Sequence, residues 1–182
     1  MQPIKQLTKI LTELADEEHY LFSLADLKGA MPDQSKGGFK ALVSRGVKDG
    51  LLKRVCRGLY LYPAVEYVSG LVLFHAAARL RADEFNYISL ETALSDAGVI
   101  SQIPINWITL MSSGRSHIVN CGDFGRIEFV HTKKQPENLR DYLIYDSHCH
   151  LWRASVALAV KDMLATKRST DLIDWSALNE LV

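Results

Sequence analysis

Apolar residues recur at helical spacing in three successive stretches near the start of the chain, which predicts three helices. The first helix is expected over residues 3–17. The second begins at Ser23, which has the spacing of a capping box with Asp26, and runs through residue 30. The third, over residues 35–49, has one polar face and one face suited to packing on a core, which carries Phe39, Leu42, Val43 and Val47.

Short apolar segments flank these helices and predict strands. Residues 19–22 suit a brief extended segment before the second helix. After the third helix, Gly50 stands where a left-handed residue commonly ends a helix. Residues 51–55 and 59–62 then fit two strands around a short loop, Cys56-Arg57-Gly58. This order is typical of a winged helix-turn-helix, and we expect residues 1–63 to form one such domain.

The remainder of the chain, residues 64–182, has a different pattern and a net acidic excess. Ser89 is expected to cap a short helix that Gly98 closes. Glycine-containing turns separate three stretches that fit successive antiparallel strands, at residues 106–111, 117–120 and 126–131. Helices are expected at residues 66–81, 147–166 and 171–182, and residues 139–144 fit either a helix or a strand. The pattern predicts an α+β domain with a small antiparallel sheet and packed helices.

Positive charge is concentrated in the third helix and the hairpin. Between Lys28 and Arg57 the sequence has eight cations and two acids, although the whole chain has a formal net charge of zero. The side chains expected to face a DNA duplex lie on the outer face of the third helix and on the hairpin: Lys36, Lys40, Ser44, Arg45, Lys48, Lys53, Arg54 and Arg57. An ordinary solvated surface is the alternative, since many winged helices bind only proteins.

Composition indicates a globular protein without a membrane span. The chain has 182 residues, of which 48% are hydrophobic, and its longest apolar stretch, residues 71–78, is shorter than the ~18 residues that span a bilayer. The N-terminus is amphipathic rather than a signal sequence. Three widely spaced cysteines fit free thiols in a reducing compartment. We therefore expect a cytoplasmic protein.

The sequence offers no strong candidate for a catalytic or metal site. His148-Cys149-His150 is the best metal candidate, but zinc ligands are usually separated by two to four residues, and a helix start is the simpler interpretation. Ser116 and His117 are neighbours, so on a strand they would face opposite ways. Glu91 and Asp96 fit exposed helix positions. Phosphate-binding and dinucleotide-binding motifs are absent. We expect no catalytic residues, no cofactor and no metal.

Two segments of the chain match the sequence patterns of a known family. The first segment, GLLKRVCRGLYLYP, matches the pattern Gly-x-hydrophobic-x-Arg…Arg-Gly-x-Tyr-x-x-Pro. The second, YISLETALSDAGVISQIPINWITLMSSGRS, has a strand, a serine-containing helix, a glycine, a Gln-x-Pro and a hydrophobic strand that ends near Gly-x-Ser. The strand RIEFVHTKK continues it. With these segments the chain resembles the AbiEi-type antitoxins of type IV toxin–antitoxin systems, and the resemblance covers about residues 1–135.

The resemblance implies a protein with two activities. Its winged helix would bind inverted repeats in double-stranded promoter DNA and would repress its own operon. Because one winged helix has a modest footprint, we expect two copies on one operator. Its C-terminal domain would oppose a nucleotidyltransferase-like toxin without a stable complex. The alternatives are a winged-helix module that binds the toxin directly, a transcriptional regulator without antitoxin activity, and an enzyme that reverses the toxin's modification.

Overall fold

The computed structural model describes residues 2–101 and 105–182, and the chain folds into two compact units, Met1–Val72 and Leu73–Val182. The domain boundary expected after Pro63 stays a prediction. Gln102 and Pro104, which belong to the second segment of the family resemblance, lie outside the described residues. Helices and two separate sheets confirm the predicted α+β class.

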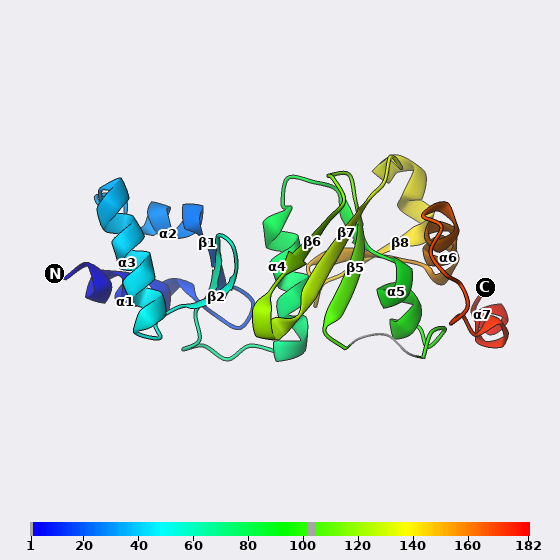
Figure 1. Cartoon of the computed structure of the whole chain (residues 1–182), viewed down its shortest axis with the longest axis horizontal. Coiled ribbons are helices and arrows are strands. Elements are labelled where there is room, and N and C mark those ends of the chain that lie inside the picture. Colours follow the sequence, from blue (N-terminus) through cyan, green and yellow to red (C-terminus); the bar gives the residue numbers. More distant parts are fainter. Residues whose placement is uncertain (1, 102–104) are drawn as a thin grey trace. The chain divides into compact units, whose positions relative to one another are not determined.

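The first unit has the expected order of helices and strands (Figure 1). Its elements are α1 Pro3–Leu14, β1 Leu21–Ser23, α2 Leu24–Ala30, α3 Lys36–Lys48, β2 Lys53–Cys56, β3 Leu59–Leu61 and the 3₁₀ turn η1 Ser69–Leu71. The strands form an antiparallel sheet in the order β1-β3-β2. In this arrangement α3 has the place of a recognition helix and the β2–β3 hairpin has the place of a wing.

Local hydrogen bonds fix the ends of the helices in the first unit. Ser23 and Asp26 form the expected capping box, because each side chain accepts a hydrogen bond from the other residue's backbone N–H. The Ser35 hydroxyl caps α3 by accepting from the N–H of Gly38 at 3.1 Å. Gly50 has φ 78°, the left-handed conformation expected after this helix. The helices enclose a core that includes Leu7, Leu11, Leu27, Met31, Leu42, Val43 and Leu52.

The second unit is built on one six-stranded sheet. Its strands are β4 Asn86–Ile88, β5 Trp107–Ser112, β6 His117–Asn120, β7 Arg126–His131, β8 Leu143–Asp146 and β9 Leu151–Ala154. The helices are α4 Val72–Leu80, α5 Leu90–Asp96, α6 Val156–Ala165 and α7 Trp175–Leu181, with 3₁₀ turns η2 Gly122–Phe124 and η3 Pro136–Tyr142. The strand order across the sheet is β6-β7-β5-β4-β9-β8.

The prediction of an antiparallel sheet is wrong in one respect, because the sheet contains both antiparallel and parallel pairs. β5 pairs with β7 in parallel, and β4 pairs with β9 in parallel. After β5 the chain crosses to the edge of the sheet as β6 and then turns back, so that β7 lies between β5 and β6. Residues 113–116 can make this crossing, since an extended chain covers about 3.3 Å per residue and strands lie about 4.8 Å apart.

Gly125 is the residue that lets β7 enter between its neighbours. Its φ is 115°, and a Cβ atom at this position would lie 2.0 Å from the carbonyl oxygen of Asn106. The next residue, Arg126, donates its backbone N–H to that same oxygen at 2.8 Å, while the N–H of Cys121 bonds to the carbonyl of Gly125 at 2.8 Å. The start of β7 is therefore joined to the chain on both sides at a point where only glycine fits.

The long helix expected over residues 147–166 is wrong. Residues 147–150 are instead the turn of the β8–β9 hairpin, and α6 begins only at Val156. One Asp146 carboxylate oxygen accepts from the backbone N–H groups of His148 and Cys149, at 3.0 and 3.2 Å, and this stabilises the turn. Ser155 then caps α6 through the N–H of Leu158. The apolar residues of this stretch thus belong to a strand and a helix in succession.

The structure also corrects or refines the expected ends of other elements in the second unit. The helix expected over residues 66–81 is shorter, since α4 follows the turn η1, and the terminal helix α7 begins at Trp175 after its cap, Asp174. Residues 139–144 divide between η3 and β8. Ser89 precedes α5 as expected, but its hydroxyl does not cap the helix.

The Ser89 hydroxyl belongs to a buried polar cluster around Asp162, a fully buried residue of α6. One carboxylate oxygen of Asp162 accepts from the hydroxyls of Ser89 at 2.7 Å and Tyr87 at 3.0 Å. The ammonium group of Lys134 donates to the other oxygen. Burial, together with the nearby carboxylate, raises the pKa of Tyr87 well above its usual range, so that its hydroxyl stays a donor. The cluster joins α6 to β4, α5 and the segment after β7.

Candidate nucleic-acid interface

The structure exposes all eight side chains predicted to contact DNA. Five of them, Lys36, Lys40, Ser44, Arg45 and Lys48, project from α3, and Lys53, Arg54 and Arg57 lie on the β2–β3 hairpin. The helix can present them because its opposite face is held in the core by Leu42 and Val43, both buried. Whether these side chains bind DNA stays a prediction.

A hollow of about 510 Å³ between α3 and the β2–β3 hairpin brings four of the predicted residues together. We call it the wing groove. Lys36, Lys40, Ser44 and Arg54 supply its polar lining, and Leu24, Phe39, Val43, Val47 and Tyr60 supply its apolar lining. Its cations come from the helix and from the wing, so an anion in this groove would contact both elements at once.

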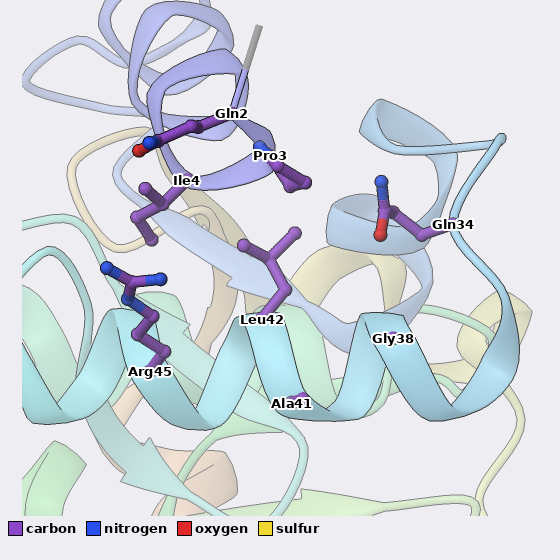
Figure 2. Close-up of a pocket in the computed structure, with 8 residues that line it drawn as sticks. All are labelled: Gln2, Pro3, Ile4, Gln34, Gly38, Ala41, Leu42 and Arg45. Carbon is purple, nitrogen blue, oxygen red and sulfur yellow. The ribbon is translucent and has the colours of Figure 1, made fainter.

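Arg45 lies on a different side of α3, in a second hollow of about 520 Å³ against the start of α1. Figure 2 shows Arg45 and Leu42 rising from α3 toward Pro3 and Ile4. The Nε of Arg45 also donates to a carboxylate oxygen of Asp49 at 3.3 Å. The predicted cations of α3 therefore do not form one cluster, because Arg45 faces away from the wing groove.

Several predicted contacts have charges that the chain itself does not neutralise. Among the described residues, Lys36, Lys40, Lys48 and Arg57 form no ion pair. Lys36 is also the first residue of α3, where the positive end of the helix dipole disfavours a cation. A phosphate group near this helix end would relieve that repulsion. These cations are thus free to serve an external anion.

Lys28 adds to the local positive charge but has a structural role. Its ammonium group donates to the carbonyl oxygen of Pro32 at 3.0 Å and to that of Gln34, and so closes the turn between α2 and α3. It also lies 5.8 Å from the centre of the Phe39 ring. Counting charges along the sequence could not separate this lysine from those that face solvent.

The wing is a short hairpin that is tied to the rest of its unit. Gly58, with φ 79°, forms the turn with Arg57. The carbonyl of Gly58 accepts from the backbone N–H of Leu24 at 3.1 Å, which fixes the turn against the start of α2. The Nε of Arg54 donates to the carbonyl of Cys56 at 3.3 Å. The wing therefore presents its cations from a fixed backbone.

Sequence reasoning missed the apolar part of the wing groove. The helical period predicts Val47 on the buried face of α3, yet the residue is 36% exposed and lines the groove. Tyr60 and Leu24 come from β3 and α2 and line the same groove. No local pattern identifies these residues, because the groove exists only once the hairpin packs beside the helix.

His148-Cys149-His150 proves to be part of a hairpin turn rather than the helix start that was expected. Cys149 is buried, and this burial, reinforced by the Asp146 carboxylate, raises the pKa of its thiol to about 12. The imidazoles of His75 and His150 stack at 4.3 Å, and His75 bonds through Nε2 to the carbonyl of His148 at 2.6 Å. In the described part of the chain, no three of the His, Cys, Asp and Glu side chains gather as metal ligands.

The other candidate chemical groups are engaged in contacts within the second unit. The Ser116 hydroxyl accepts from the backbone N–H of His131 at 2.9 Å. Glu91 forms an ion pair with Arg168, and Asp96 forms one with Arg153, each at 2.6 Å. These interactions engage Ser116, Glu91 and Asp96, three of the candidate catalytic residues.

The first unit has the element order of a winged helix-turn-helix, with exposed cations on α3 and on the β2–β3 hairpin. Residues 9–63 match the family described as "Transcriptional regulator, AbiEi antitoxin", which confirms the family resemblance over α3 and the wing. The matched residues lie within the first unit and include none of the second. No curated protein matches the chain. The second segment of the resemblance, from Tyr87 onward, lies beyond the matched residues and stays a prediction.

The chain contains no membrane-spanning helix in residues 2–101 and 105–182, since none of its helices there is both long and apolar enough.

Proposed function

We propose that this protein is the antitoxin of a type IV toxin–antitoxin system and the autorepressor of its own operon. The observation that carries the DNA-binding part is the set of exposed cations on α3 and the wing, within the residues that match the AbiEi antitoxin family. Four of them, Lys36, Lys40, Lys48 and Arg57, form no ion pair with any residue that the structure describes. Two copies would bind an inverted repeat in the promoter. The alternative is a winged-helix module that binds a protein partner through the same surface.

In this proposal α3 enters the major groove and the wing follows the phosphate backbone. Lys36, Lys40 and Arg54 line one groove in the structure, so phosphates can bridge helix and wing there. Lys48 and Arg57 extend the contact with DNA beyond this groove, and Arg45 reaches the DNA strand on the other side of α3. Binding should weaken steeply as salt rises, because each neutralised phosphate releases counterions.

Replacing Lys40 and Arg57 together by alanine is expected to weaken binding to the DNA upstream of the operon about 10- to 100-fold, and to reduce the salt slope by about 2. Both side chains are exposed and form no ion pair among the described residues, so the fold should be unaffected. Lys9→Ala is the matched control, since Lys9 is an exposed cation of α1 that pairs with Glu13. A gel-shift titration at several salt concentrations measures both quantities.

Absence of binding by the wild-type protein would contradict the DNA-binding proposal. So would equal binding by the wild type and the double variant, because the contacts would then lie elsewhere. A loss of the same size in Lys9→Ala would show that net charge, and not this surface, determines the affinity.

We further propose that the second unit neutralises a nucleotidyltransferase-like toxin without a stable complex and without chemistry of its own, in the cytoplasm. The full-length double variant Lys40→Ala, Arg57→Ala should then still rescue growth when the neighbouring toxin is expressed, although it no longer represses the promoter. A growth assay and a promoter reporter measured in the same strain separate the two activities.

Loss of rescue together with repression would overturn this division between the units. Copurification of the wild-type chain with the toxin would favour direct binding, and failure of the wild type to rescue would favour a regulator without antitoxin activity.

A further inference from the structure

The sheet of the second unit ends at a short edge strand, β8, that has no lysine, proline or bulge. β8 pairs with β9 on one side, and no strand among the described residues pairs with its other side. Natural edge strands are commonly blocked by lysine, proline or a bulge. β8 has the sequence Leu-Ile-Tyr-Asp, its pairing with β9 is regular, and its one charge, Asp146, is paired with Arg153. Ile144 is 75% exposed and Tyr145 is 51% exposed.

The pairing with β9 shows which backbone groups of β8 face outward. The carbonyl of Tyr142 accepts from the N–H of Ser155 at 2.7 Å, so the hydrogen-bonding groups of Tyr142 point toward β9. In an antiparallel pair this direction alternates along the strand, and Ile144 and Asp146 therefore also bond inward. The N–H and C=O groups of Leu143 and Tyr145 point away from β9 and are available to another strand.

An apolar surface adjoins this free edge. A hollow of about 290 Å³ beside β8 is lined by Phe85, Pro136, Leu143 and Trp152, together with Glu137 and Arg140. Trp152 is 44% exposed, and Tyr145 meets it edge-on with the ring centres 5.3 Å apart. Exposed aromatic and aliphatic side chains that adjoin one another commonly mark an interaction site.

We propose that β8 pairs with β8 of a second copy of this chain, antiparallel and about a two-fold axis at Ile144. Leu143 would then exchange backbone hydrogen bonds with the partner's Tyr145, which uses both outward-facing residues of each strand. Ile144 would face the partner's Ile144 as a non-hydrogen-bonded pair. Tyr145 would lie beside the partner's Leu143, at the mouth of the hollow of that subunit.

Charge favours a second copy as the occupant of this edge. The hollow carries both an acid, Glu137, and a base, Arg140, and neither forms an ion pair among the described residues. A two-fold axis can place each charge near the opposite charge of the other copy, as in other self-complementary interfaces. The biological use of the dimer rests on the proposed function, because an inverted repeat requires two copies. The pairing itself rests only on the edge strand.

The test is the oligomeric state of the full-length protein without DNA, measured by sedimentation equilibrium. We expect the wild type to dimerise. Ile144→Lys should raise the dissociation constant of the dimer at least about tenfold, since like charges placed opposite each other destabilise strand pairing. Ile118→Lys is the matched control, because Ile118 is 48% exposed on β6, the strand at the other edge of the same sheet. This variant should dimerise like the wild type.

A disulfide tests the register of the pair. Ile144→Cys should crosslink the two copies on mild oxidation. The Cα atoms of facing residues in a non-hydrogen-bonded pair lie about 4.5 Å apart, which is within the Cα–Cα range of a disulfide. The native cysteines, Cys56, Cys121 and Cys149, are all buried and should not interfere. Ile118→Cys is again the control and should stay monomeric on a non-reducing gel.

A monomeric wild type would overturn the inference, as would dissociation that is equal in the two lysine variants or crosslinking that is equal in the two cysteine variants. Circular dichroism of Ile144→Lys excludes unfolding as the cause of dissociation. If the protein dimerises through β8 but does not bind operon DNA, the dimer stands and the proposed function fails. If it binds DNA as a monomer, or a toxin occupies the edge in place of the second copy, the dimer fails and the DNA-binding proposal stands.

Discussion

Replacing Gly125 by alanine should destabilise the second unit by at least about 3 kcal/mol. The backbone at this residue has φ 115° and ψ −143°, a region that only glycine adopts readily. The added Cβ would also lie 2.0 Å from the carbonyl oxygen of Asn106, which is a backbone atom and cannot move aside as a flexible side chain could. Relief of this clash would separate the start of β7 from β5.

Gly122→Ala is the matched control for this prediction. Gly122 lies in the same turn and also has a positive φ, 57°, but a Cβ at this position meets nothing within 4 Å. Gly122→Ala should lower the free energy of unfolding by about 1–2 kcal/mol, the usual penalty for a left-handed residue with a side chain.

Urea unfolding followed by tryptophan fluorescence measures these effects in the second unit alone, because Trp107, Trp152 and Trp175 all belong to it. Equal losses in Gly125→Ala and Gly122→Ala would mean that the close approach to Asn106 does not determine stability.

Asp162→Ala should destabilise the second unit by about 2–6 kcal/mol, because it removes the fully buried acceptor of two buried hydroxyl donors. The substitution leaves the hydroxyls of Tyr87 and Ser89 without their acceptor. Each buried donor that loses its partner costs about 1–3 kcal/mol. Loss of the ion pair with Lys134 adds less to this cost, because the Lys134 side chain is 34% exposed and its ammonium group can be solvated.

Two further variants separate charge from hydrogen bonding at Asp162. Asp162→Asn keeps the shape and one acceptor oxygen, so it should lie between the wild type and Asp162→Ala. Asp171→Ala removes an exposed acid of the same unit and should change the free energy of unfolding by no more than about 0.5 kcal/mol. A loss below about 1 kcal/mol in Asp162→Ala would show that the cluster does not hold α6 to the sheet.

Much of the first unit could be predicted from the sequence because its signals are local. A capping box depends on residues three positions apart, and Ser23 with Asp26 forms it as expected. The left-handed Gly50 follows its helix directly. The apolar face of α3 was assigned by periodicity, and its inner residues, Leu42 and Val43, are buried. Each of these features is determined within one or two turns of the chain.

The incorrect predictions for the second unit concern residues whose structure is determined by contacts with distant segments. Residues 147–154 have a composition that also suits a helix, but pairing with β8 and β4 makes residues 151–154 a strand. Ser89 has the position of a helix cap, but its hydroxyl bonds to Asp162, far along the chain. A local sequence pattern predicts hydrogen bonds between neighbouring residues, but it does not contain the distant residue that the fold brings to the same side chain.

The sequence by itself determined the element order of the winged helix, its caps and the cationic residues of α3 and the wing, because helical period, cap spacing and charge are properties of neighbouring residues. The tertiary structure alone decided that Lys36, Lys40 and Arg54 share one groove while Arg45 faces another. It also decided that β7 lies between β5 and β6 and that β8 is left at the edge of the sheet. Strand order and surface clustering depend on contacts between segments remote in the chain, which no local pattern records.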